Sequence, residues 1–196
     1  LNEAYSDIWG ETVDRINGRG GDTPDQARTA GACTASTPLE PTLTVNAPGS
    51  IAGSLPAGGA SFGLQSFSLT SDLVQVKAGG AQSVGCTVAD FTASGVAGKV
   101  AFVDRGVCGF AVKADNASAA GATGLVIGNN QGGTAVISMS GAMTQPAIPV
   151  LSISQTDGTA VKGRFAANET VNVTMTRGGF GSDNSVRWLM GEDSTG

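Results

Sequence analysis

Residues 98–130 place the strongest constraint on the fold, because they read as one complete strand–helix–strand unit. Val100–Val103 and Leu125–Ile127 are short apolar runs, as expected of strands that are covered on both faces. Between them, small and apolar residues recur at three- and four-residue spacing and so share one side of a helix: Phe110, Ala114, Ala117 and Gly121. Lys113 is expected on another face of that helix. The unit predicts two parallel strands joined by a right-handed crossover.

The same stretch resembles a known family. The segments GKVAFVDRG, CGF, AVKADNASAAGATG and LVIGNN, followed later by IPVLSIS, stand in the order and spacing of the protease-associated (PA) domain, over roughly residues 84–175. The resemblance implies an α/β (α+β) domain with a twisted, barrel-like β-sheet flanked by two or three helices. It also implies a domain without catalytic machinery, of the kind inserted in, or attached to, secreted proteases and sorting receptors.

Charge and hydropathy exclude several partners. The net charge is −5 and no basic cluster occurs, so nothing in the chain would neutralise the phosphates of a nucleic acid or an anionic membrane surface. No stretch approaches the roughly 20 apolar residues of a membrane span. Forty per cent apolar residues are enough for a core, and the 196 residues suit one domain with appendages.

The chain contains no histidine. This excludes Ser-His-Asp and Cys-His catalysis and removes the commonest neutral metal ligand. Pairs of carboxylates, Ser-Lys pairs and threonine nucleophiles remain as alternatives, but no arrangement of residues points to them.

The three cysteines are Cys33, Cys86 and Cys108. Cys86 and Cys108 flank the first buried strand, and closing the loop between them contributes about 3 kcal/mol to stability on the chain-entropy model. Low charge and few aromatic residues suit an exported, disulfide-bonded protein. We therefore expect a Cys86–Cys108 disulfide, with pairings through Cys33 and a fully reduced chain as alternatives.

Residues 1–17 read as an amphipathic helix on which Glu3 and Asp7 lie one turn apart. The sequence NEAYSD at positions 2–7 is similar to the N-E-x-x-S-D helix of thermolysin-like zinc metallopeptidases and their fungalysin-type relatives. RWLMGED at positions 187–193 looks like the segment that follows this helix in the same peptidases. The resemblance implies that Glu3 is a zinc ligand and that Asp7 orients a zinc-bound histidine. The alternative is a solvated acidic face.

These resemblances imply a piece of a secreted zinc metallopeptidase in which a PA domain is inserted. The expected organisation is a helix of the parent peptidase at 1–17, a linker at 18–38, the PA domain at 39–178 and a return segment at 179–196. The H-E-x-x-H helix that supplies two histidine ligands and the general base is absent from the chain. The chain by itself therefore needs no cofactor, and zinc belongs to the parent enzyme.

A candidate binding surface follows the ends of the two buried strands. Arg105 and Val107 come after the first strand, and Asn129 and Asn130 come after the second. The loops after neighbouring parallel strands meet at one edge of a sheet, where the ligands of α/β proteins bind. Arg105 suits a peptide carboxylate. The alternative is structural, with Asp104 and Arg105 paired locally and the asparagines holding turns.

The function that we expect is a non-catalytic PA domain of a secreted, extracellular zinc metallopeptidase. It would bind a polypeptide substrate or the parent's catalytic domain, or gate access to the protease. The alternative is a purely structural insertion that stabilises or spaces the parent. Leu1, Tyr5, Ile8 and Trp9 would be exposed on an isolated N-terminal helix, so self-association of the fragment is also expected.

We expect the chain by itself to hold no zinc and to hydrolyse no casein, because one carboxylate cannot hold a catalytic zinc ion. Metal analysis of the purified chain and a casein digestion assay measure the two. Proteolysis by the chain that is abolished in a Glu3→Gln variant would contradict the non-catalytic assignment.

Overall fold

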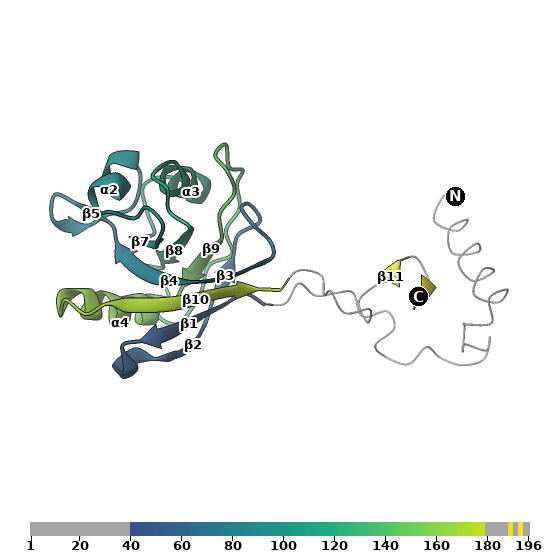
Figure 1. The fold of residues 1–196 in the computed structure, drawn as a ribbon, viewed down its shortest axis with the longest axis horizontal. Coiled ribbons are helices and arrows are strands. Elements are labelled where there is room, and N and C mark those ends of the chain that lie inside the picture. The colour runs from purple at the N-terminus through teal and green to yellow at the C-terminus, as the bar shows by residue number, and fades with distance from the viewer. Residues whose placement is uncertain (1–39, 179–187, 190–191, 194–196) are drawn as a thin grey trace. The chain divides into compact units, whose positions relative to one another are not determined.

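The structure is a computed structural model that describes residues 40–178, together with 188–189 and 192–193. Residues 40–178 form one compact unit (Figure 1). In the other unit, β11 (Trp188–Leu189) pairs with β12 (Glu192–Asp193) as a short antiparallel ribbon. Glu3, Asp7 and Cys33 lie outside the described residues, so their predicted roles stay predictions.

A mixed eight-stranded sheet forms the centre of the compact unit, in the order β2-β1-β10-β4-β7-β8-β9-β3. The strands are β1 (Thr42–Ala47), β2 (Gly53–Pro56), β3 (Gly58–Gly59), β4 (Phe67–Gln75), β7 (Val100–Asp104), β8 (Gly124–Gly128), β9 (Val150–Ile153) and β10 (Val171–Arg177). A small ribbon pairs β5 (Lys77–Ala78) with β6 (Ala81–Gln82), and η1 (Gly49–Ile51) is a 3₁₀ turn. The mixed α/β fold predicted from the sequence is confirmed.

Three helices flank the sheet: α2 (Val88–Ala93), α3 (Phe110–Ala119) and α4 (Gln155–Ala166). Helices α2 and α3 lie on one side of the sheet and α4 on the other (Figure 1). Ser154 caps α4 by accepting a hydrogen bond from the backbone N–H of Asp157 at 3.1 Å. None of the helices in the described part of the chain is long and apolar enough to cross a bilayer.

The strand–helix–strand unit forms as predicted. β7 and β8 are parallel neighbours, in register from Val100 opposite Gly124 to Asp104 opposite Gly128, and α3 connects them. β9 extends the parallel set on the far side of β8, and β4 extends it on the far side of β7. Four parallel strands therefore end at one edge of the sheet.

Alternate residues of the parallel strands enter two separate cores. Ala101 and Val103 pack with α2 and α3, whereas Val100 and Phe102 pack on the side of α4. All four residues are fully buried. This two-sided cover explains why these strands are continuous apolar runs with no polar alternation.

The antiparallel half of the sheet buries one face only. On β10, Val171, Val173 and Met175 are buried, and the residues between them are partly exposed. The hydroxyl groups of Thr42 and Thr176 lie 2.6 Å apart across the β1–β10 pair. The body therefore begins and ends on two neighbouring antiparallel strands.

We expect Gly58→Ala to lower the free energy of unfolding by about 1–3 kcal/mol, the usual range for overpacking. A Cβ at this position would overlap the backbone carbonyl of Ile137 and lie 2.5 Å from Oγ of Ser152. Gly49→Ala is the matched control, since a Cβ there meets nothing within 4 Å, and its effect should stay within about 0.5 kcal/mol. Urea unfolding measures both variants, and equal stabilities would contradict the packing described here.

Candidate binding site at the carboxyl edge of the parallel strands

Loops from three neighbouring strands meet at the carboxyl edge of the sheet. β7 ends at Asp104, β8 at Gly128 and β9 at Ile153, and the backbone N–H of Arg105 donates to the carbonyl of Gly128 at 2.9 Å. The N–H of Asn129 donates to the carbonyl of Ile153, also at 2.9 Å. The three loops are thus held together by backbone hydrogen bonds at the edge where α/β proteins place their ligands.

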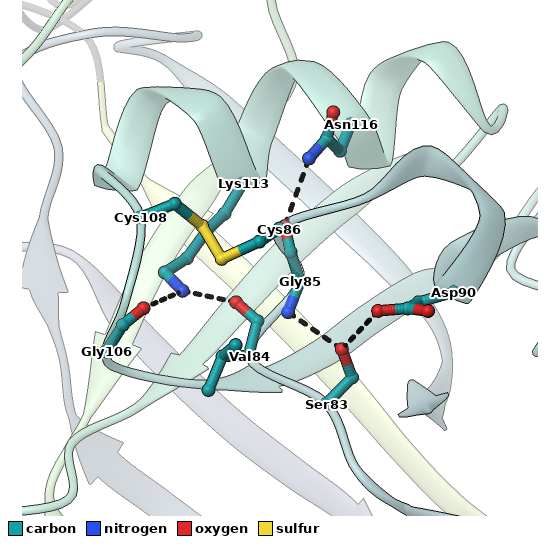
Figure 2. The surroundings of a disulfide bond; sticks show 9 residues. All are labelled: Ser83, Val84, Gly85, Cys86, Asp90, Gly106, Cys108, Lys113 and Asn116. Carbon is teal, nitrogen blue, oxygen red and sulfur yellow. Dashed lines mark hydrogen bonds between the residues drawn. A yellow bond between two sulfur atoms is a disulfide. The ribbon is translucent and has the colours of Figure 1, made fainter. Parts of the chain in front are cut away.

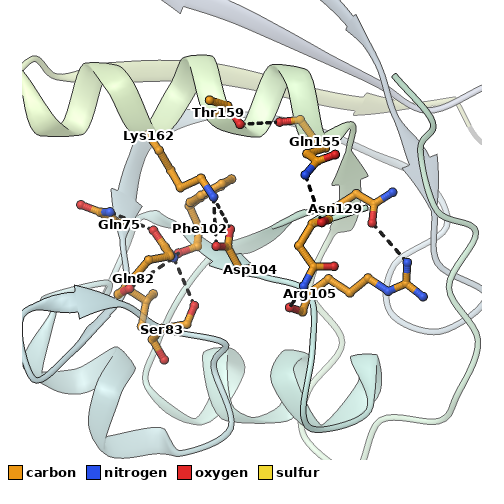
Figure 3. A network of polar contacts seen from close by, with 12 residues as sticks. Gln75, Gln82, Ser83, Phe102, Asp104, Arg105, Asn129, Gln155, Thr159 and Lys162 are labelled. Atoms are coloured by element: carbon orange, nitrogen blue, oxygen red, sulfur yellow. Dashed lines mark hydrogen bonds and ion pairs between the residues drawn. The ribbon is translucent and has the colours of Figure 1, made fainter. Parts of the chain in front are cut away.

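Arg105 projects from the loop after β7 toward the loop after β8 (Figure 3). Its Nη1 donates to Oδ1 of Asn129 at 3.2 Å, and the side chain is partly exposed. Among the described residues no carboxylate forms an ion pair with it. Asp104 instead pairs with Lys162 of α4 at 3.0 Å, so the local Asp104–Arg105 pair considered from the sequence does not form. The guanidinium group therefore keeps hydrogen-bonding capacity toward solvent.

The two asparagines differ in their surroundings. Asn129 is 6% exposed, and its side chain also donates to the carbonyl of Ala135 at 3.0 Å and accepts from the N–H of Gln131 at 3.3 Å. Its contacts hold the turn and orient Arg105. Asn130 is exposed, and its Nδ2 donates to the carbonyl of Arg105 at 3.1 Å. The structure thus brings Arg105, Asn129 and Asn130 together as predicted, and the role of Asn129 is to hold the turn.

Val107 lies at the tip of the loop after β7 in a costly conformation. Its φ is 62°, which is unfavourable for a β-branched residue, and its side chain is 94% exposed. The N–H of Cys108 donates to the carbonyl of Gly106 at 2.9 Å, which closes a γ-turn around Val107. A γ-turn with positive φ at its centre is the rarer and more strained form. Strain of this kind, combined with an exposed apolar side chain, is typical of functional surfaces.

Cys86 and Cys108 form a disulfide, with their Cα atoms 5.8 Å apart (Figure 2). This is the pairing favoured from the sequence. Three of the exposed large apolar side chains lie within four residues of a bridged cysteine: Val88, Val107 and Val112. The disulfide therefore joins two segments that each carry exposed apolar side chains.

Lys113 is fully buried, and its predicted position on an outer face of α3 is wrong. Its Nζ donates to the carbonyl of Gly106 at 2.7 Å and to the carbonyl of Val84 (Figure 2). Lys113 is three residues after Phe110 and four before Ala117, so the helical spacing could have placed it on the covered face. A lysine is normally exposed because of its charge. Here the carbonyl groups of two loops accept hydrogen bonds from the ammonium group, which makes its burial possible.

Burial lowers the pKa of Lys113 from 10.5 to about 8, because desolvation disfavours the ammonium form. The negative charge of Asp104 acts in the opposite direction and limits the shift.

Two further polar residues of this region were missed from the sequence, Lys162 and Gln155. The Nε2 of Gln155 donates to the carbonyl of Asn130 at 3.1 Å, and no sequence spacing indicates either contact.

The residues in the described ranges do not fit a catalytic zinc ion. No group of three or more histidine, cysteine, aspartate or glutamate side chains lies together there, and the chain has no histidine at any position. Cys86 and Cys108 are bonded to each other, which removes them as thiolate ligands. What this edge offers is hydrogen-bond donors, one guanidinium group and an exposed apolar side chain. That set suits the binding of a ligand.

Comparison with protein families identifies this body. Residues 69–161 match the family model described as "PA domain", from within β4 to within α4. The chain therefore contains a PA domain, as its sequence resemblance predicted.

The relatives of the chain are peptidases. It is 36% identical over 104 residues to the probable lipoprotein aminopeptidase LpqL of Mycobacterium tuberculosis, covering 53% of this chain and 21% of the relative. It is 38% identical over 81 residues to the minor extracellular protease Vpr of Bacillus subtilis, covering 41% of this chain and 10% of the relative. The structure of BSAP, a zinc aminopeptidase from Bacillus subtilis, superposes with a TM-score of 0.54 at 26% identity, covering 71% of this chain and 30% of that one.

The chain thus spans a third or less of the length of each of these proteins, and what it shares with them includes the PA domain. The predicted relation to thermolysin- and fungalysin-like peptidases rests on residues 2–7, which lie outside the described ranges, and on residues 187–193, which are described only in part, and it stays a prediction.

We expect the contribution of Lys113 to the free energy of unfolding to increase as the pH rises from about 8 to 10.5. Within this window the unfolded chain still binds the proton that folded Lys113 has lost, so stability rises with pH, by at most about 1.4 kcal/mol per pH unit. Below about pH 8 the burial penalty is fully present. Urea unfolding of wild type and of Lys113→Met across this window measures the difference. Lys99→Met, which removes an exposed lysine, is the control, and parallel curves for all three would contradict the expectation.

Proposed function

We propose that residues 40–178 are the non-catalytic PA domain of a secreted peptidase and that they bind polypeptide through the carboxyl edge of the parallel strands. The observation that carries the proposal is the guanidinium group of Arg105. Asn129 orients it, and no described carboxylate neutralises it. An oriented, partly exposed cation at this edge is a ready receptor for a negative group.

The ligand that fits this edge is an extended peptide segment with a carboxylate and a neighbouring apolar side chain. Arg105 takes the carboxylate in a bidentate manner, as guanidinium groups do. The carboxamide of Asn130 is exposed and suits a backbone amide of the peptide. Val107 offers an apolar contact whose exposure is otherwise unfavourable. Carboxylates of both C-termini and acidic side chains have this chemistry.

The parent enzyme is proposed to be a zinc metallopeptidase. The likeness to a zinc aminopeptidase of Bacillus subtilis supports this assignment. Zinc would be held by the parent's catalytic domain, to which Glu3 contributes a ligand and Asp7 a supporting contact. An extracellular location agrees with the Cys86–Cys108 disulfide.

A purely structural insertion is the second candidate. The observation that favours it is the burial of Asn129 and the density of hydrogen bonds among the three loops, which rigidify this edge without any ligand. In that case Arg105 contributes to stability only. The two candidates differ in what happens when its charge is removed.

We expect Arg105→Gln to abolish the preference of the chain for a free carboxylate. The probes are acetyl-Ala-Val-Leu with a free C-terminus and the same peptide amidated, titrated against the side-chain amide signal of Asn130 and the methyl signals of Val107 by NMR. Wild type should bind the free acid at least fivefold more tightly than the amide, because the amide loses a charge-assisted hydrogen-bond pair. The variant should bind both equally.

The control is Arg164→Gln, which makes the same substitution at an arginine of α4 that pairs with Glu169. It should leave the fivefold preference in place. Equal binding of the two peptides by wild type would overturn the binding proposal. Loss of stability in Arg105→Gln without any change in peptide binding would establish the structural alternative.

A further inference from the structure

Two independent links join the same pair of loop segments. The disulfide connects Cys86 to Cys108. The ammonium group of Lys113 binds the carbonyl of Val84, two residues before Cys86, and the carbonyl of Gly106, two residues before Cys108. Figure 2 shows both links side by side beneath the N-terminal half of α3. The two links are of different kinds, since one is a covalent bond and the other is a pair of hydrogen bonds donated by a side chain of α3.

The first of these segments is held firmly on its own. Nδ2 of Asn116 on α3 donates to the carbonyl of Gly85 at 3.2 Å. The N–H of Gly85 donates to Oγ of Ser83 at 2.9 Å, and that hydroxyl donates to Asp90 of α2 at 2.8 Å. This segment is therefore an anchor with contacts to two helices.

The second segment carries the strained turn and has fewer contacts. Its tip, Val107, has φ 62° and is 94% exposed, and within residues 40–178 the Gly106–Cys108 bond is the one backbone hydrogen bond that spans it. A conformation of this cost persists only where the surroundings impose it. A backbone hydrogen bond from Asp104 to Ser83 at 3.1 Å holds the end of β7 to the anchor. Beyond that point, the ammonium group of Lys113 and the disulfide connect the turn itself to the anchor.

We propose that Lys113 is a positioning residue of the binding edge, whose ammonium group acts together with the Cys86–Cys108 disulfide to hold the Val107 turn, so that each link stabilises the other. The inference rests on the proposed function for one point only, that the turn belongs to a binding surface. Because coupling between two links is reciprocal, removing the ammonium group must weaken the disulfide as much as reducing the disulfide weakens the ammonium contacts.

The coupling is measurable as a redox equilibrium. Two glutathione thiols reduce the disulfide, giving the Cys86 and Cys108 thiols and one glutathione disulfide, with two electrons and two protons transferred from glutathione. In wild type the ammonium group keeps the two segments together after reduction, which favours re-formation of the bond. We expect Lys113→Met to raise the equilibrium constant for reduction at least tenfold, equivalent to about 30 mV.

The control is Lys99→Met, which removes the same charge from an exposed position and should leave the equilibrium constant within twofold of wild type. Amide hydrogen exchange at Cys108, the donor in the turn, is the second readout. Reduction should speed this exchange in both proteins, and at least tenfold more in Lys113→Met, in which neither link remains. An unchanged equilibrium constant in Lys113→Met, or equal exchange rates in the two reduced proteins, would overturn the proposal.

A measurement on wild type alone covers the case in which Lys113→Met does not fold. Reduction should loosen the turn and admit water to the ammonium group, so the titration midpoint of Lys113, followed by the NMR shift of its Cε, should move upward from about 8 toward 10.5. An unmoved midpoint refutes the coupling. None of these readouts uses a peptide, so they succeed or fail separately from the Arg105 experiment.

Discussion

Burial of β7 and β8 on both faces is the constraint on which the rest of the structure depends. Their side chains alternate between two cores, so helices must cover both faces of the sheet. Because β7 and β8 are parallel, the chain must also cross over the sheet between them. That crossover brings the loops after β7, β8 and β9 to one edge. The position of the proposed binding edge is therefore a consequence of how the two cores are built, and its polar groups lie where the buried strands end.

This part of the architecture is readable from the sequence because the signal is local. Val100–Val103, Leu125–Ile127 and the small-residue stripe of α3 each carry a short-range pattern, and the meeting of Arg105, Asn129 and Asn130 follows from topology alone. Helix α2 is too short to show a helical period, and Phe91 is its one buried residue. It could not be predicted by periodicity.

Lys113 marks the limit of such reasoning. Its position in α3 is compatible with burial, but its charge predicts exposure unless partners are known. Those partners are backbone carbonyls of Val84 and Gly106, 29 and seven residues away in sequence, and carbonyls have no residue signature. The pairing of Asp104 with Lys162 has the same character, at a separation of 58 residues. Contacts that depend on tertiary placement of backbone groups are not encoded in residue type.

The pairing of β1 with β10 affects how this body can be inserted into another protein. Antiparallel neighbours lie about 5 Å apart, so the two ends of the body are separated by roughly the width of an ordinary surface loop. A host that accepts it at a loop keeps its own flanking residues in place and loses little conformational entropy for the added length. Geometry of this kind suits insertion of the body into a larger chain. The chain is similar over part of its length to a probable aminopeptidase and to an extracellular protease.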